Sequence, residues 1–217
     1  MTTMSTNPLS IIIFLSLLSL LPILFILTTS FVKVAMVLLM TRESLGVQQI
    51  PPNIVIYSLS LILTFYIMGP VYNKTMINVG DTLKSNNLSS QVLIDSFNNS
   101  SQDIRTFLIK HSPKKQQEFF YQSLKQFWTP EMMANVKKDD LIILVPAFMV
   151  SELTQAFKIG FLIYLPSVII DIIVSNILMA MGMMMMSPVT ISLPIKLLLF
   201  ISLDGWSRLI HVLLNSY

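Results

Sequence analysis

Long apolar segments with almost no charged residues constrain this chain more than any other feature. No charged residue occurs between Leu9 and Val32, and none occurs in the 19 residues from Ile54 to Tyr72. A helix needs about 20 mainly apolar residues to cross the hydrocarbon core of a bilayer. Of the 217 residues, 53% are apolar and 12% are charged, whereas an average soluble domain is roughly one quarter charged. The sequence therefore predicts an all-α integral membrane protein.

The first apolar segment is longer than a single membrane crossing requires. It continues past Lys33 to Met40, and Pro22 within it predicts a kink. The residues before Leu9 include no Lys or Arg, and no small-residue cleavage site follows. We therefore expect an uncleaved membrane helix and no removable secretory signal. Together with the second apolar segment, this predicts a region of N-terminal membrane helices over residues 1–72.

The composition changes between residues 73 and 140. This stretch holds nine Lys or Arg and seven acidic residues, with many Asn, Ser and Gln. Thr129 followed by Pro130 is typical of a helix start, since proline is favoured in the first turn. The stretch is therefore predicted to be a soluble helical segment. The short loop that carries Lys33 and Arg42 prefers the cytoplasm, which places the soluble segment on the other side of the membrane.

The last third of the chain, residues 141–217, does not resemble a series of ordinary membrane spans. The run from Leu141 to Met186 is apolar for 46 residues, which is about 69 Å of helix and more than twice the thickness of the membrane core. Pro166 and Asp171 are expected to interrupt it. We predict that this region forms bent or broken helical hairpins.

Ionisable residues within this apolar third need partners. The last segment, Val189–Leu214, contains fifteen Leu, Ile, Val or Phe, worth about −5 to −9 kcal/mol of insertion free energy, and its three charges oppose insertion by about 8 to 10 kcal/mol. The charges are expected to stabilise an oligomer, although an ion or proton path through a transporter or channel is an alternative. The residues concerned are Glu152, Lys158, Asp171, Lys196, Asp204 and Arg208.

The spacing of these charges indicates how they can be neutralised. Asp204 and Arg208 are i, i+4 neighbours and can form an ion pair with each other. Lys196 and Asp171 have no such neighbour, so their partners are expected in another helix or another subunit.

A methionine cluster near the end of the long apolar run is the most unusual local feature. Six of the eight residues from Met179 to Met186 are Met, and Gly182 and Ser187-Pro188 supply turn signals around them. Such flexible thioethers commonly fill packing gaps in membrane helices. The same flexibility would let a ring of them close a pore against water and ions and still yield to a polypeptide. Both readings are open at this stage.

Several other functions are disfavoured by the residues present. The chain has no cysteine and only two histidines, His111 and His211, far from the methionines, so no metal site is expected. Sequence motifs of metalloproteases, serine hydrolases and nucleotide-binding loops are absent, so we expect no enzyme and no cofactor. The net charge of +3 comes from scattered basic residues, which argues against nucleic-acid binding.

Two groups of sequence strings resemble the FliP/SctR family of type III secretion export proteins. The first comprises Leu45-Gly46-Val47-Gln48-Gln49-Ile50-Pro51-Pro52-Asn53 and Met68-Gly69-Pro70-Val71. The second comprises Ala156-Phe157-Lys158-Ile159-Gly160-Phe161-Leu162-Ile163-Tyr164-Leu165-Pro166, Ile170-Asp171, the methionine run and Asp204-Gly205-Trp206. The resemblance implies one subunit of an export gate in the bacterial inner membrane, which passes unfolded proteins. It also implies a ring-like assembly of about five copies with SctS-like and SctT-like proteins.

The resemblance also implies roles for particular residues. In the family a methionine-rich loop narrows the channel, and this role carries over onto Met183, Met184, Met185 and Met186, with Met181 beside them. The assembled complex is expected to lie largely above the membrane plane, with residues 73–140 in the periplasm. The expected lack of a cleaved signal favours an injectisome member over a flagellar one.

Overall fold

The computed structural model describes residues 16, 19–20, 22–47, 49–84, 102–134, 136–183 and 185–217. Every regular element in these ranges is a helix, which confirms the predicted all-α class. The labelled helices are α2 (Phe31–Ser44), α3 (Asn53–Lys84), α5 (Lys114–Phe127), α6 (Pro130–Met133), α7 (Leu141–Ala180), α8 (Pro188–Ser202) and α9 (Gly205–Asn215). Residues 22–28 and 102–111 are also helical.

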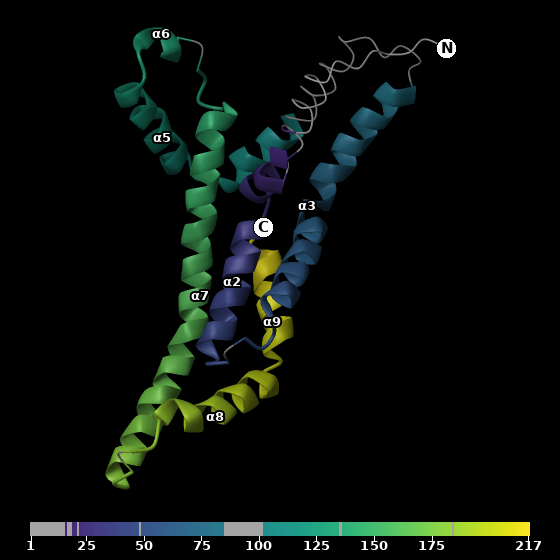
Figure 1. The fold of residues 1–217 in the computed structure, drawn as a ribbon. Coiled ribbons are helices and arrows are strands. Elements are labelled where there is room, and N and C mark those ends of the chain that lie inside the picture. The colour runs from purple at the N-terminus through teal and green to yellow at the C-terminus, as the bar shows by residue number, and fades with distance from the viewer. Residues whose placement is uncertain are drawn as a thin grey trace.

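Helix α7 runs without interruption for 40 residues and extends along most of the molecule, from the end that carries α5 and α6 to the turn before α8 (Figure 1). Its length is about 60 Å at 1.5 Å per residue. Pro146 and Pro166 both lie inside it, so the prediction that Pro166 and Asp171 interrupt the run was wrong. Each proline removes one backbone hydrogen bond, and α7 continues through both positions.

The bend described in the first apolar segment lies C-terminal to Pro22. The helix Pro22–Thr28 meets α2 at 80°, with the break at Thr29 and Ser30. Leu21 lies outside the described residues, so the kink expected at Pro22 stays a prediction. The Thr29 hydroxyl donates to the Phe25 carbonyl at 2.7 Å and accepts from the Phe31 amide at 3.4 Å. These side-chain bonds compete with the helical backbone bonds at the break.

Two apolar clusters pack the helices around the upper part of α7. The first joins α2, α3, α7 and α9 through Val34, Val37, Leu38, Ile56, Leu63, Ala156, Leu209 and Leu213. The second joins α3, the helix 102–111 and α7 through Met68, Phe107, Leu108, Leu144 and Phe148. Gly160 of α7 lies directly against the Met40 side chain of α2, so these two helices approach closely there. Of the described helices, α8 is the one that lies against the far end of α7 (Figure 1).

The last apolar segment, for which no internal break was predicted, is broken into α8 and α9, which meet at 64°. This is consistent with the bent or broken hairpins expected for residues 141–217 as a whole. The break lies at Leu203 and Asp204, and Asp204 has a φ of +50°. Two helical segments are long and apolar enough to cross a membrane, namely Asn53–Asn73 and α7, or up to four if each bent pair counts as one span. This supports a membrane location for the chain.

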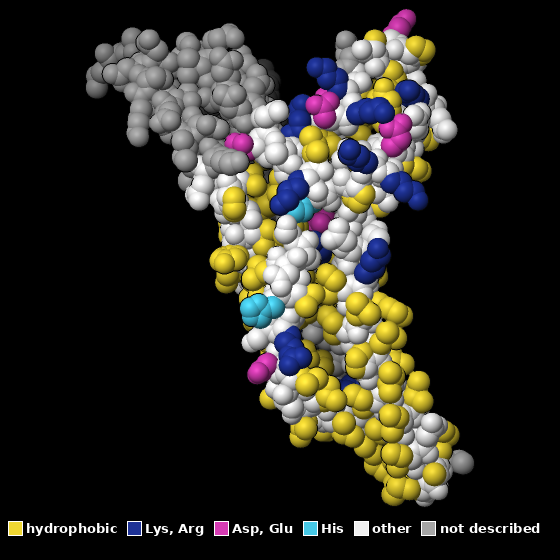
Figure 2. Space-filling view, turned by 180° about the vertical axis from the view of Figure 1, so that it is seen from behind, with side chains coloured by type: hydrophobic (Ala, Val, Ile, Leu, Met, Phe, Trp, Pro, Cys, Tyr) yellow, Lys and Arg dark blue, Asp and Glu magenta, His cyan; other side chains and the backbone are white. Residues whose placement is uncertain are grey.

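The stretch predicted to be soluble contains short helices where the structure describes it. Thr129 is the N-cap of α6 and Pro130 its first residue, which confirms that helix-start signal. Helix α3 continues past residue 72 to Lys84, so no helix ends at the predicted boundary. Figure 2 shows most charged side chains around the α5–α6 end, while apolar side chains cover the opposite end.

Candidate gate loop and buried charges

The methionine cluster forms the turn between α7 and α8, called here the Met loop (residues 181–187). The Gly182 amide donates to the Met179 carbonyl at 3.0 Å, and the Met183 amide donates to the Leu178 carbonyl at 2.9 Å. This pattern, with Gly182 at a φ of +73°, is a Schellman motif that ends α7. Ser187 is the N-cap of α8 and Pro188 its first residue. Local sequence signals therefore set both ends of the loop.

The methionine side chains of the loop have little protein around them. Met185 is fully exposed, at 102%, and Met181, Met183 and Met186 are 62%, 42% and 48% exposed. Met184 lies outside the described residues. The loop lies at the tip of the molecule, at the end of α7 farthest from α5 and α6 (Figure 1). Large apolar side chains at a tip are unfavourable in water, which indicates that another surface covers them.

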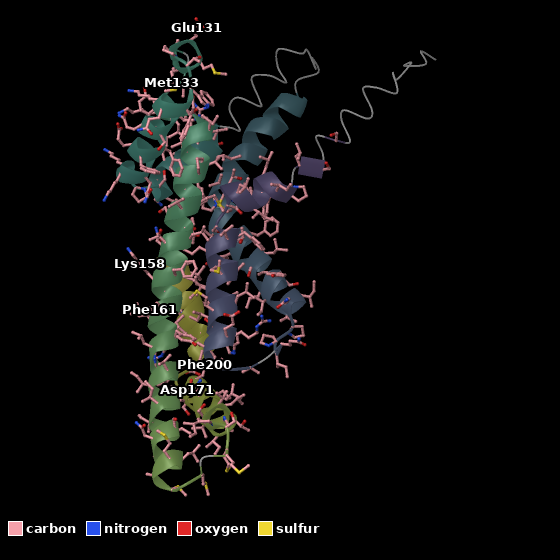
Figure 3. The ribbon with its side chains drawn as sticks, turned by 60° about the vertical axis from the view of Figure 1, so that its left-hand side comes forward. Glu131, Met133, Lys158, Phe161, Asp171 and Phe200 are labelled. Atoms are coloured by element: carbon pink, nitrogen blue, oxygen red, sulfur yellow. The ribbon has the colours of Figure 1, made fainter. Side chains whose placement is uncertain are left out.

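An ion pair joins α7 to α8 behind the Met loop. Lys196 Nζ lies 2.6 Å from Asp171 Oδ2, and the Ser192 hydroxyl donates to Asp171 Oδ1 at 2.5 Å. The Lys196 side chain is 5% exposed and that of Asp171 34%. Figure 3 shows Asp171 on the part of α7 near α8. The predicted partner in another helix is thus found within the same chain for both residues, so they do not require a second subunit.

A second buried charge cluster lies at the other end of α9. Lys33 of α2 and Glu152 of α7 are both fully buried, with Lys33 Nζ 3.3 Å from Glu152 Oε1. The Tyr217 hydroxyl donates to Glu152 Oε2, and Lys33 Nζ lies 3.4 Å from the centre of the Tyr217 ring. Lys33 Nζ also donates to Gln155 Oε1 at 3.1 Å. Glu152 therefore has its charged partner within the chain.

Three other predicted charges lie elsewhere and have no described side-chain partner. Lys158 is exposed and points away from the helices packed on α7 (Figure 3). Asp204 and Arg208 are exposed too, and no ion pair between them occurs in the described part of the chain. Their predicted i, i+4 pairing fails because Asp204 precedes α9 in a left-handed conformation, where the helical spacing does not apply. Among the described residues they are linked through the backbone, where the Arg208 amide donates to the Asp204 carbonyl at 3.1 Å.

Sequence reasoning missed Lys33, Ser192 and Tyr217 as members of these clusters. Lys33 was interpreted as a loop charge that orients the chain, yet it is completely buried. Its isolation within a long apolar run was a usable signal, because buried lysines require a partner. Tyr217 gave no such signal, since its partners Lys33 and Glu152 are remote in sequence.

Nothing in the described residues suggests a resident metal ion, since no group of three His, Asp or Glu lies close enough to bind one. A cavity of about 640 Å³ lies between α3, the helix 102–111 and the end of α9. It is open and lined mainly by aromatic and aliphatic side chains with Lys110 and His111. The described residues thus provide two ion-pair clusters and an exposed apolar loop.

Comparison with known proteins gives a consistent result over almost the whole chain. Residues 14–213 match the model of the FliP family. The chain is 50% identical over 214 residues to "Yop proteins translocation protein R" of Yersinia pestis, covering 97% of each chain. It is 45% identical over 217 residues to "Virulence protein YscR" of Salmonella typhimurium, covering 97% of each.

A plant-pathogen relative is similar over its full length. The "Harpin secretion protein HrcR" of Erwinia amylovora is 41% identical over 217 residues, covering 100% of each chain. The resemblance inferred from the sequence strings is thereby confirmed: the chain belongs to the FliP family.

Proposed function

We propose that this protein is a subunit of the export gate of a bacterial type III secretion system and passes unfolded proteins across the inner membrane. Membership of the FliP family supports this, as do relatives described as translocation and harpin secretion proteins. These relatives favour an injectisome over a flagellar system. The role requires positioned helices and a closable opening, and it requires neither a cofactor nor a catalytic residue.

The observation that carries the gate assignment is the exposed Met loop at the tip of the α7–α8 hairpin. Met185 is fully exposed, and three further described methionines are at least 42% exposed. Copies of this loop that meet around an axis would bury these side chains against one another and exclude water. Because thioether chains are flexible, the seal would still deform around a passing polypeptide. We assign this role to Met181, Met183, Met184, Met185 and Met186.

Assembly into a ring of about five copies with SctS-like and SctT-like proteins is part of the proposal. Its support is the large apolar surface left on α7, which includes Phe157, Phe161 and Leu162 at 55%, 58% and 66% exposure. Surfaces of this kind occur at protein or lipid contacts. Native mass spectrometry of the purified complex tests the assembly. Several copies with two small membrane partners support it, and a stable solitary chain contradicts it.

We further propose three regions: membrane helices over residues 1–72, a periplasmic segment over 73–140, and hairpins that form pore wall and gate over 141–217. The charged α5–α6 end and the apolar opposite end support this division (Figure 2). Because the chain has no cysteine, a Gln122→Cys variant gives a single label site on α5. Labelling of intact spheroplasts by a membrane-impermeant maleimide supports the periplasmic assignment, and protection until lysis contradicts it.

The gate assignment is tested by replacing Met183, Met184, Met185 and Met186 together with Ala. We expect the complex to assemble and to leak small ions, because four large apolar side chains are lost from the seal. Replacing Met132 and Met133 of α6 with Ala is the matched control, since these methionines lie at the other end of the molecule (Figure 3). Unchanged ion conductance in an assembled Met-loop variant would contradict the gate assignment.

The alternative function, an ion or proton path through the intramembrane charges, receives less support. Asp171 is paired with Lys196 and Glu152 with Lys33 in two separate clusters on different parts of α7. Paired and separated charges do not provide the continuous series that proton transfer needs. Reconstitution of the lone chain in liposomes distinguishes the two functions, because specific transport by the single chain favours the alternative.

A further inference from the structure

We propose that Tyr217 is a positioning residue of the gate: its hydroxyl anchors the end of α9 to the buried Lys33–Glu152 pair, and α9 in turn holds α8 and the Met loop in place. This proposal rests on the gate function proposed above and assigns a part in it to a residue at the opposite end of α9.

The phenol of Tyr217 completes a charge cluster that is otherwise under-satisfied. Glu152 is fully buried, and its Oε1 makes no hydrogen bond although Lys33 Nζ lies 3.3 Å away. The bond from the Tyr217 hydroxyl to Oε2 is therefore the hydrogen bond that Glu152 receives within the described residues. A buried carboxylate without such a donor is strongly unfavourable.

The position of the Tyr217 ring is fixed from several sides. Lys33 Nζ lies over one face of the ring at 3.4 Å, and the Phe107 ring is stacked with it at a centroid distance of 6.5 Å. The His111 ring is 5.3 Å away, between centroids. Lys33 Nζ also lies 3.4 Å from the Ser216 carbonyl. The end of α9 thus contacts α2, α7 and the helix 102–111 together.

At the other end of α9 the chain bends sharply. Asp204 has a φ of +50°, an unfavourable conformation for a residue with a side chain, and the 64° angle between α8 and α9 lies there. The angle between α8 and α9 stays constant only if each of the two helices is held in place by contacts of its own. Lys196 with Asp171 fixes α8, and Leu209, Leu213 and Tyr217 fix α9. Because the two leucines make only nondirectional apolar contacts, Tyr217 is the member of this set that defines the orientation of the end of α9.

The test compares Tyr217→Phe with Tyr57→Phe in the assembled complex. Tyr217→Phe keeps the ring and removes the hydroxyl, which donates to Glu152 Oε2 and, at the longer distance of 3.4 Å, to the Ser30 carbonyl. The hydroxyl of Tyr57, which is 40% exposed, makes no described hydrogen bond. The cysteine-free chain accepts a pair of spin labels at Val212→Cys on α9 and Thr154→Cys on α7, both exposed. Labelled chains are diluted with unlabelled ones so that distances within one chain dominate.

We expect Tyr217→Phe to add a second α7–α9 distance, with the ratio of displaced to native α9 rising about tenfold, as expected for loss of one charge-assisted hydrogen bond. Ion leak per assembled complex should rise with it, and Tyr57→Phe should change neither. A purely structural role would lower the amount of complex without changing leak per complex. An unchanged distance overturns the proposal, and so does a displaced α9 with unchanged leak.

A second set of variants tests the proposal even if the Tyr217→Phe protein accumulates poorly. In a Lys33→Met, Glu152→Met background no buried carboxylate needs the hydroxyl, and apolar replacements of a buried pair are often tolerated. There, Tyr217→Phe should leave the label distance unchanged, whereas displacement of α9 in that background overturns the proposed mechanism. The two proposals fail in different ways. If the gate assignment is wrong, the Met-loop variant does not leak. If only the Tyr217 assignment is wrong, the Met-loop variant leaks and Tyr217→Phe does not.

Discussion

Lys196 and Asp171 form a short ion pair across the α7–α8 hairpin, with Lys196 Nζ 2.6 Å from Asp171 Oδ2 and Ser192 bound to the other carboxylate oxygen. The pair is asymmetric in its surroundings. The lysine is 5% exposed, whereas 34% of the carboxylate side chain remains accessible. Loss of one partner therefore leaves the other in a very different environment.

We predict that Asp171→Asn destabilises the protein more than Lys196→Met does. Asp171→Asn leaves a buried ammonium without its counter-charge, and breaking a buried pair in this way costs about 3–5 kcal/mol. Lys196→Met leaves a carboxylate that retains Ser192 and access to its surroundings, so the expected loss is about 1–2 kcal/mol. Thermal unfolding in detergent measures the difference.

The double variant Asp171→Asn, Lys196→Met provides the control for this asymmetry. It should be more stable than Asp171→Asn alone, because the unpaired buried charge is removed with its partner. Equal midpoints for the two single variants, or a double variant no better than Asp171→Asn, would show that the pair does not behave as a buried ion pair in the membrane.

Gly182→Ala is predicted to displace the Met loop without any steric clash. No atom lies within 4 Å of the position that a Cβ would occupy, but the backbone has a φ of +73°. A left-handed conformation costs about 1–2 kcal/mol for a residue with a Cβ. We expect reduced closure of the assembled complex, measured as ion leak, and a smaller effect for Gly182→Asn, which tolerates this conformation.

Gly69→Ala is the matched control for that substitution. Gly69 also has no atom within 4 Å of the Cβ position, and it lies inside α3 with ordinary helical geometry. Alanine in a helix interior is stabilising relative to glycine by about 0.5–1 kcal/mol, a gain that the following Pro70 reduces because its ring crowds a preceding Cβ. A Gly69→Ala variant that leaks as much as Gly182→Ala would mean that the leak does not report on the Met-loop backbone.

The sequence predicted the helices and their caps better than the contacts between them. Thr129-Pro130 and Gly182 gave correct helix ends because capping is local. The helix break predicted at Pro166 was wrong. Whether a proline ends a helix depends on what replaces the backbone hydrogen bond that it removes, and this is determined by the residues packed around it. Asp171 and Lys196 were expected to need partners, and the structure pairs them with each other. The role of the six charges in assembly stays a prediction.

Which partner each charge takes could not be deduced from one sequence. Lys33 and Glu152 are 119 residues apart, and only the packing of α2 on α7 brings them together. Asp204 and Arg208 had helical spacing but lie at a bend, so their spacing was misleading. Long-range pairing depends on helix packing, whereas spacing reports only on residues within one regular helix.

The last prediction concerns the pH dependence of the helix 102–111, which lies outside the candidate membrane spans. Burial, together with the positive charges of Lys110 and Lys33, lowers the pKa of His111 to about 4. In the unfolded chain its pKa returns to about 6.5. The unfolded state therefore binds the proton more readily, and stability should fall as the pH drops from about 6.5 to about 4. Because His111 is only half-buried, the expected loss is on the order of 1 kcal/mol.

His111→Gln should abolish this contribution, so the variant should lose less stability than the parent protein between pH 6.5 and pH 4.5. His211→Gln, which removes an exposed histidine from α9, is the control for the loss of a titratable ring. Lys110→Gln should reduce the dependence in part, since one of the charges that opposes protonation of His111 is gone. Thermal midpoints across this pH range measure all three variants. If His111→Gln followed the same pH profile as the parent while His211→Gln flattened it, the pH-dependent stability would lie in α9, and the burial of neutral His111 would not contribute to it.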